Sequence, residues 1–270
     1  MSDAIPYLSV SKISTFMKCP LQAKFRYVDK IPEPALGVFL FGKVVHAAVE
    51  RALRAVQIGG KLPSWQDMTD WLPGIFEAQV KEDEDRGSFV GWDWGDDTLA
   101  AQKKDAPALV KLVREDVLPS IRPVLVESKF NYPLPSKIGE FKIYGVIDLF
   151  EEGGMLTDWK TTSKVSANAK KLDIQLPAYT IHTNSVYDSG VGFGTDRVNE
   201  ARKIFLVRGS KPKIEVVNYK IHEGHRQWFR DNAARVWQMI EAGAFVANTT
   251  TWACSEGWCS FWQGCQGELA

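Results

Sequence analysis

The middle of the chain changes from helical to strand-like patterns, and this change limits the possible folds more than any other feature. Three short runs rich in β-branched and aromatic residues cover residues 124–134, 141–152 and 153–162, with Gly139 and the pair Gly153-Gly154 as turns between them. The remaining periodic segments predict helices over residues 9–28, 41–56, 64–83, around 97–117, 171–186 and 223–243, and strands over 201–208 and 213–220. This order predicts an α/β (α+β) fold in which a mixed sheet is flanked by helices.

Proline and glycine positions set the expected interruptions. A break is expected where Pro20 follows Cys19, and a second one near Pro73-Gly74. Residues 86–97 are expected to form a loop. The loop contains Trp92 and Trp94, which could stack on unpaired bases or form a hydrophobic lid, and the lid is the favoured interpretation.

The composition is that of an ordinary globular protein and excludes some classes. The 270 residues are 45% hydrophobic, and 33 basic residues balance 33 acidic ones. Zero net charge excludes binding of nucleic acid by bulk positive charge, although a local basic groove is compatible with it. No apolar run approaches the ~20 residues of a membrane helix, and the start lacks a secretory signal pattern. We expect a cytoplasmic protein with no membrane partner.

The four cysteines are unevenly placed. Cys19 lies near the start, whereas Cys254, Cys259 and Cys265 lie within a Gly- and Trp-rich tail. Four cysteines are too few for a disulfide scaffold, and a reducing compartment would keep them as thiols. The close spacing of the last three predicts metal ligands.

Two acids and a lysine lie on neighbouring predicted strands. Asp148 lies in YGVIDLF and Asp158 in LTDWKT, and a hairpin at Gly153-Gly154 would let both carboxylates reach one cation. Lys160 follows Asp158 by two positions, so strand alternation places both on one face. Such a set can hold a divalent cation with water and phosphate, and the lysine can orient the water. The alternative is a salt bridge at a solvated edge, which contributes about 0–1 kcal/mol.

Two further side chains could complete this site. Glu127 lies on the preceding strand and could supply a third acid; the alternative is an exposed strand glutamate. His46 lies four residues after Gly42 in the helix predicted over 41–56, and a neutral imidazole there would favour Mn²⁺ over Mg²⁺. The alternative for His46 is a hydrogen-bonded core histidine. Gly42 would let the helix approach the strands closely.

Gln175 and Tyr179 are spaced at i and i+4 in the helix predicted over 171–186, so they share one face. The functional interpretation is that an amide and a phenol reach a phosphate or base next to the metal. The alternative is that Tyr179 packs inward while Gln175 is solvated.

Taken together, five ordered motifs resemble the PD-(D/E)xK nuclease superfamily. The closest likeness is to its RecB-like branch, which includes the iron–sulfur exonucleases of CRISPR adaptation and small phage-encoded relatives. The motifs, in chain order, are SVSKISTFMKCPLQAKFRY, FGKVVHAAVE (G-x-x-x-H), GVIDLF (the first acid), TDWKT (D-x-K) and QLPAY (Q-x-x-x-Y). The resemblance implies a restriction-endonuclease-like fold over residues 1–270 as one domain, with a mainly helical region 1–118, a catalytic core 119–245 and a cysteine tail 246–270.

The resemblance also implies roles for these residues. His46, Asp148, Asp158 and the backbone carbonyl of Trp159 would hold Mg²⁺ or Mn²⁺, while Lys160 would position the attacking water. Gln175 and Tyr179 would help to place the nucleic acid or the lysine. The implied activity is a metal-dependent DNA exonuclease that acts on single strands or DNA ends in recombination, repair or replication. The alternatives are a non-catalytic nucleic-acid-binding scaffold and a phosphoesterase for small nucleotides.

For the cysteines, the resemblance implies that Cys19 joins Cys254, Cys259 and Cys265 as four ligands of a [4Fe–4S] cluster that joins the chain ends. The four residues between Cys254 and Cys259 depart from the two expected in this branch. Zinc in a Cys₄ site and unligated thiols are the alternatives.

DNA binding would depend on local basic segments. The candidates are Lys12, Lys18, Lys24, Arg26, Lys164, Lys170, Lys171 and the segment 201–213. Each of these has the alternative of an ordinary solvated surface.

Overall fold

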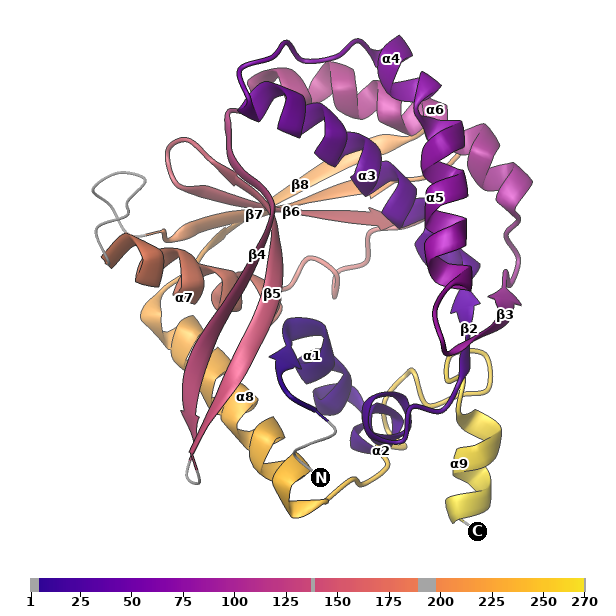
Figure 1. The fold of residues 1–270 in the computed structure, drawn as a ribbon, viewed down its shortest axis with the longest axis vertical. Coiled ribbons are helices and arrows are strands. Elements are labelled where there is room, and N and C mark those ends of the chain that lie inside the picture. Colours follow the sequence, from indigo (N-terminus) through magenta and orange to yellow (C-terminus); the bar gives the residue numbers. More distant parts are fainter. Residues whose placement is uncertain (1–4, 137–138, 189–197, 270) are drawn as a thin grey trace.

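A mixed six-stranded sheet forms the centre of the protein (Figure 1). The computed structural model describes residues 5–136, 139–188 and 198–269. The strands of the sheet are β1 (Leu8–Ser9), β4 (Pro123–Ser136), β5 (Gly139–Glu151), β6 (Met155–Thr162), β7 (Glu200–Val207) and β8 (Lys213–Lys220). None of the described helices has the length and apolar character needed to cross a membrane.

Strand β5 organises the sheet because it pairs with three other strands. On one edge it forms a long antiparallel hairpin with β4. On the other edge it pairs with β1 in parallel near Ile143 and with β6 in antiparallel fashion near Leu149. Strand β6 then pairs in parallel with β7, and β7 pairs in antiparallel fashion with β8. The predicted mixed sheet is therefore confirmed.

Helices cover both faces of this sheet. The helices are α1 (Val10–Lys18), α2 (Pro20–Ala23), α3 (Gly37–Gln57), α4 (Trp65–Asp70), α5 (Leu72–Glu84), α6 (Leu99–Asp116), α7 (Gln175–Asp188), α8 (Glu223–Ala242) and α9 (Trp262–Leu269), with the π-helical turn η2 (Lys24–Val28) and the 3₁₀ turn η3 (Leu118–Ser120). Helices α3, α5 and α6 pack together on one side, and α1, α7 and α8 pack on the other (Figure 1).

Each face of the sheet has its own hydrophobic core. Under α3 the fully buried residues Leu40, Val44 and Ala48 recur at helical spacing and pack in a cluster that includes Trp159 of β6. The cluster on the opposite face joins α1, α7 and α8 to the β4–β5 hairpin and includes Phe130. The two cores meet across the strands that carry the predicted acids.

The breaks in the N-terminal half differ in part from the predictions. Helix α1 ends before Cys19 and α2 begins with Pro20, as predicted. The break predicted near Pro73-Gly74 lies instead at Trp71, because Pro73 occupies the first turn of α5, where its missing N–H has no partner to lose.

The segment predicted as a loop over residues 86–97 contains strand β3 (Phe89–Asp93). This strand pairs in parallel with β2 (Glu33–Leu36) to form a small second sheet. Trp92 and Trp94 stack on each other with ring centroids 5.1 Å apart and pack against the core under α3. Trp94 also covers Gly37, where a Cβ atom would lie 2.3 Å from its ring. This packing corresponds to the lid interpretation.

Candidate active site

The side chains that the sequence singles out come from elements around the paired strands β5 and β6. They are His46 on α3, Asp148 on β5, Asp158 and Lys160 on β6, and Gln175 and Tyr179 on α7. Helices α3 and α7 both contact β6, from opposite faces of the sheet. The chain therefore brings these side chains together from segments up to 133 residues apart, from His46 to Tyr179.

The two strands that carry the acids are joined as the glycine turn predicts. Gly153 and Gly154 have φ values of 84° and 85°, a conformation that glycine adopts at little cost. The strands pair on either side of this turn, and Asp148 Oδ2 accepts a hydrogen bond of 2.9 Å from the backbone N–H of Trp159. The first acid is thus held by the residue that lies between Asp158 and Lys160.

A chain of polar contacts leads from β6 to α7. Lys160 Nζ donates to Asp158 Oδ1 at 3.0 Å and to Gln175 Oε1 at 2.7 Å, and Gln175 Nε2 donates to Tyr179 Oη at 3.3 Å. Lys160 Nζ also lies 2.9 Å from Asp158 Oδ2, but this contact lacks the angles of a hydrogen bond. The amide of Gln175 therefore orients the lysine, and Tyr179 orients the amide.

The acids of this site are held in an environment that disfavours their charge. Burial raises the pKa of Asp158 to about 7, and Asp148 adds to the rise while Lys160 opposes it. Burial also raises the pKa of Asp148. Burial and then the charge of Asp148 raise the pKa of Glu127 to about 8. Against the effect of its burial, the charges of Asp158 and Asp148 raise the pKa of Lys160. Asp148 and Asp158 thus share the ammonium group of Lys160, and a divalent cation would further balance the acids of this site.

Strand β5 changes the face of its side chains at Asp148. Ile147 packs in the core under α7 and α8, whereas Leu149 packs in the core under α3. A regular strand would keep both on one face. Opposite Asp148, Glu127 lies on β4 between the residues paired with Leu149 and Ile147, and its φ is 45°, which is rare for a non-glycine residue. This local distortion places Glu127 beside Asp148 rather than on an exposed strand face.

The imidazole of His46 is held in its neutral form. Burial, reinforced by the charge of Lys160, lowers its pKa to about 4, although Asp158 opposes the shift. Its ring makes no hydrogen bond with any described residue, in contrast to a hydrogen-bonded core histidine. Gly42, one turn earlier, is not required for close packing: a Cβ atom there would lie 3.6 Å from the Cβ of Thr161, an ordinary van der Waals contact.

The donor chemistry of this site fits a hard divalent cation. Asp158 Oδ2 is buried without a hydrogen bond, and carboxylates with a neutral imidazole suit Mg²⁺ or Mn²⁺. The ligand set is not assembled, however. Across residues 5–136, 139–188 and 198–269, no three His, Cys, Asp or Glu side chains are grouped so that one ion could contact them all. Binding of an ion would therefore require these side chains to shift.

Two residues that the sequence did not assign to this site, Asp173 and Lys203, border it. Lys203 is 3% exposed, and its Nζ lies 2.5 Å from Asp173 Oδ2. Asp173 Oδ1 accepts a hydrogen bond of 3.1 Å from the backbone N–H of Gln175. The D-x-Q spacing of Asp173 and Gln175 was a sequence signal that could have pointed to Asp173. Nothing in the local sequence indicates that Lys203 is buried.

Several cations that the sequence offers for DNA contact are engaged in ion pairs within the protein. The pairs are Lys24–Asp29, Arg26–Glu33, Lys170–Glu215, Arg202–Glu151, Lys203–Asp173 and Arg208–Asp97. Most of the cations of the segment 201–213 are thus committed to the fold. Lys164 and Lys171, in the segment between β6 and α7, are exposed.

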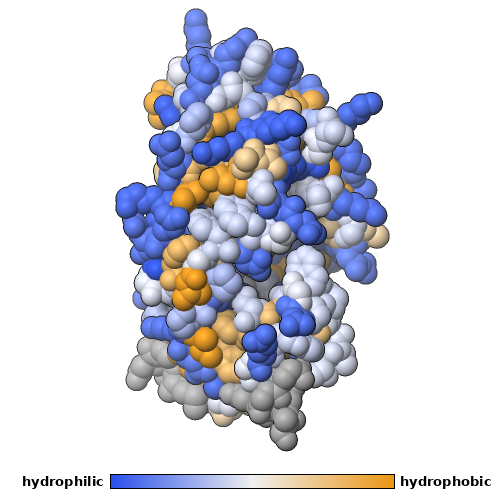
Figure 2. Space-filling model, turned by 90° about the vertical axis from the view of Figure 1, so that its right-hand side faces the viewer, coloured by the Kyte–Doolittle hydropathy of each residue, from blue (hydrophilic) through white to orange (hydrophobic). Residues whose placement is uncertain are grey.

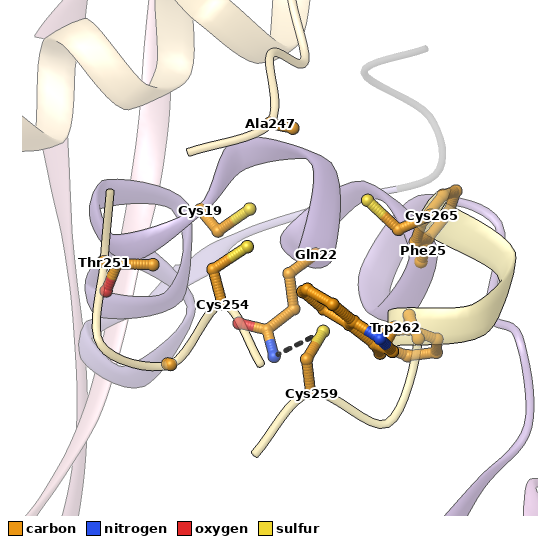
Figure 3. A pocket seen from close by; sticks show the side chains of 11 residues that line it. Cys19, Gln22, Phe25, Ala247, Thr251, Cys254, Cys259, Trp262 and Cys265 are labelled. Atoms are coloured by element: carbon orange, nitrogen blue, oxygen red, sulfur yellow. Dashed lines mark hydrogen bonds between the residues drawn. The ribbon is translucent and has the colours of Figure 1, made fainter. Parts of the chain in front are cut away.

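The four cysteines lie around one pocket formed by both ends of the chain (Figure 3). Apart from the cysteines, the walls of this pocket are largely apolar and include Phe25 and Phe261. Cys19 lies at the start of α2, and Cys254, Cys259 and Cys265 follow α8.

Polar groups contact two of these sulfur atoms. The backbone N–H of Asn248 donates to Cys19 Sγ at 3.5 Å, and Gln22 Nε2 donates to Cys259 Sγ at 3.8 Å (Figure 3). The sulfur atoms are not arranged around one point as the ligands of a single zinc ion, within the described part of the chain. A four-iron cluster distributes its thiolates over separate iron atoms and does not require such convergence.

Comparison with known proteins supports the same fold. The crystal structure of a putative exonuclease from Eubacterium rectale superimposes with a TM-score of 0.53 at 12% sequence identity, covering 92% of this chain and 87% of that one. The solved structure of SSO0001 covers 98% of this chain and 88% of its own at 10% identity, but its TM-score of 0.42 is too low to support an argument. No curated protein matches the sequence significantly.

The sequence profile of the PD-(D/E)XK nuclease superfamily matches residues 7–266, nearly the whole chain. The match runs from β1 into α9, which it covers up to residue 266. The protein therefore belongs to the PD-(D/E)XK nuclease superfamily.

Proposed function

We propose that this protein is a metal-dependent DNA exonuclease that hydrolyses phosphodiester bonds in single strands or at DNA ends, in the service of recombination, repair or replication. The observation that carries the proposal is the buried acid pair Asp148 and Asp158 with the oriented ammonium of Lys160. Membership of a nuclease superfamily supports the hydrolytic chemistry. The structural neighbour named as a putative exonuclease supports the choice of exonuclease.

In this proposal His46, Asp148, Asp158 and the backbone carbonyl of Trp159 hold Mg²⁺ or Mn²⁺, and Glu127 supplements them. When bound, the ion acidifies the attacking water and neutralises charge on the phosphate. Lys160 orients that water or stabilises the negative charge that develops on the phosphorus oxygens. Gln175 keeps the ammonium directed toward the site, because its Oε1 accepts from Lys160 Nζ at 2.7 Å.

The enzyme assay tests this function directly. Purified protein with Mn²⁺ or Mg²⁺ is incubated with 5′- and 3′-labelled single- and double-stranded DNA, and the products are resolved by length. Wild type should release short products from one end, and Asp158→Ala and Lys160→Ala should each lose about 10²-fold or more of the rate. Equal degradation by wild type and both variants would show that a contaminant is responsible. Preference for mononucleotides would favour a phosphoesterase instead.

For the cysteine pocket we propose a [4Fe–4S] cluster held by Cys19, Cys254, Cys259 and Cys265. The support is that four thiol-bearing side chains from both chain ends line one largely apolar pocket. Protein purified without air should contain about four irons and four sulfides per chain and show a broad visible absorption band. Stoichiometric zinc without iron would overturn the assignment.

A further inference from the structure

A buried ion pair lies next to the Asp158–Lys160–Gln175 chain without belonging to the proposed chemistry. Lys203 is on β7, in register with Asp158 on the neighbouring strand β6. Only 3% of Lys203 is exposed, and its Nζ lies 2.5 Å from Asp173 Oδ2. Burying an ammonium group is costly even when it is paired, and an apolar side chain of similar size is often as stable. General stability is therefore a weak reason for a lysine at this position.

Asp173 connects this ion pair to the active site. One carboxylate oxygen, Oδ2, faces Lys203, while the other, Oδ1, accepts the backbone N–H of Gln175 at 3.1 Å. Gln175 is the first residue of α7, and a short acidic side chain that accepts from such an N–H fixes the first turn of a helix. The side chain of Gln175 in turn holds Lys160 at 2.7 Å. The contacts form an unbroken path from β7 to the proposed catalytic lysine.

The turn between β6 and α7 has a second, outer attachment to the sheet. Tyr219 of β8 donates its hydroxyl to the backbone carbonyl of Lys170 at 2.9 Å, and the side chain of Lys170 pairs with Glu215 at 2.8 Å. The Lys170 side chain is 46% exposed, whereas that of Lys203 is 4% exposed. The Lys170–Glu215 pair thus ties the same turn to the sheet without reaching Gln175, and it provides a matched control.

We propose that Lys203 is a positioning residue that acts through Asp173 to hold Gln175 where it orients Lys160. The inference rests on the proposed nuclease function and adds a residue to its machinery. Lys203 does not touch the substrate. Its ammonium is a fixed point on β7 to which the first turn of α7 is attached. The amide of Gln175 therefore cannot move away from Lys160.

The first test measures steady-state kinetics with end-labelled DNA. Lys203→Met should lower kcat about ten-fold and leave KM within about two-fold, because orientation of Lys160 matters in the chemical step and little in substrate binding. Lys203→Arg keeps the charge and should restore most of the rate. Asp173→Asn, which removes the ion pair from the other side, should resemble Lys203→Met. Glu215→Gln, which breaks the outer Lys170–Glu215 pair, should leave kcat unchanged.

The decisive test is a double-mutant cycle with Gln175→Ala. If Lys203 acts through Gln175, then Lys203→Met should lower kcat in the wild-type background but not further in the Gln175→Ala background. A full ten-fold additional loss in that background would overturn the proposal, and so would an unchanged kcat in Lys203→Met. If Lys203→Met does not fold, the same cycle is run with Asp173→Asn, because the side chain of Asp173 is partly exposed.

These results are separable from failure of the proposed function. If wild-type protein does not cleave DNA with either metal, or if Asp158→Ala is as active as wild type, the nuclease proposal itself is wrong. If wild type cleaves and Asp158→Ala does not, the cycle reports on Lys203 alone. Thermal melting of each variant identifies losses of kcat that follow from unfolding rather than from orientation.

Discussion

Asp148 accepts a 2.9 Å hydrogen bond from the backbone N–H of Trp159, so the first acid of the site is fixed by the strand that carries the second acid and the lysine. The bond crosses from β5 to β6 just beyond the last pair in register, Leu149 with Thr157. The spacing of the two acids is thereby set by the backbone of the hairpin rather than by flexible side chains.

Two substitutions at Asp148 should separate its structural role from its charge. Asp148→Asn keeps an oxygen that can accept from Trp159 but removes a buried negative charge, so metal-free protein should be at least as stable as wild type. Asp148→Ala leaves the Trp159 N–H without a partner and should lower the free energy of unfolding by about 1–3 kcal/mol. Both should lose about 10²-fold or more of nuclease activity. Urea unfolding in the presence of a chelator measures the stabilities, and equal stabilities of the two variants would contradict the structural role.

Binding of Mn²⁺ should strengthen as pH rises. In the absence of metal, the pKa of Asp158 is about 7 and that of Glu127 about 8, so both carboxyl groups carry protons in part of the neutral range. A cation must displace those protons, and the apparent affinity should therefore fall by up to about ten-fold per pH unit for each proton displaced as pH drops from about 8 to about 6. Calorimetry in buffers of different ionisation enthalpy counts the protons released.

The matched control for this pH dependence is Glu127→Gln. This substitution removes the carboxyl group with the higher of the two raised pKa values. The affinity for Mn²⁺ should therefore change less with pH between about pH 7 and 8. An affinity for Mn²⁺ that does not change with pH in either protein would contradict the electrostatic description of the site.

Two glycines should respond oppositely to alanine. At Gly145 on β5 a Cβ atom would lie 2.3 Å from the ring of Phe130, so Gly145→Ala should destabilise the protein by about 1–3 kcal/mol. At Gly42 the nearest atom is 3.6 Å away, and alanine favours helix, so Gly42→Ala should be neutral or stabilising by up to about 1 kcal/mol. Chemical denaturation compares the two, and loss of stability in Gly42→Ala would show that the helix position is more crowded than described.

Removal of one cysteine should matter only when the pocket is filled. Cys254→Ser should abolish retention of iron and lower the melting temperature of protein purified without air, because binding energy at a site that joins distant segments is also folding energy. In metal-free protein the same substitution changes one sulfur to oxygen at a partly exposed position and should shift the melting temperature by no more than about 2 °C. An equal loss of stability in both forms would indicate a purely packing role for Cys254.

Local patterns predicted the five long strands of the main sheet, most helices and the elements that carry the candidate site. The D-x-K strand, the helix with His46 and the Q-x-x-x-Y helix are each defined by residues adjacent in sequence, and strand β3 was missed because its pairing with β2 is not a local property. The helix break lies at Trp71 rather than at Pro73, because proline is tolerated both before a helix and in its first turn. The position of Pro73 alone therefore does not fix where the break lies.

Features that arise from packing could not be predicted in this way. The positive φ of Glu127 accompanies a change of face on two paired strands, and no sequence period signals it. Lys203 lies in a segment whose basic character suggested exposure to DNA, yet pairing with Asp173 takes it into the interior. On the face shown in Figure 2, the apolar patches of the surface are small and separated by hydrophilic areas. The overall composition does not reveal this distribution.

The cysteine pocket imposes an order on biosynthesis. One wall is made by residues 19–25 and the other by residues 247–265, so the pocket does not exist while the ribosome is still translating the intervening part of the chain. A cofactor held by all four thiols can be completed only after residue 265 has left the exit tunnel. A premature stop codon before residue 254 would yield a polypeptide that contains the paired acids and the lysine but has none of the three late thiols.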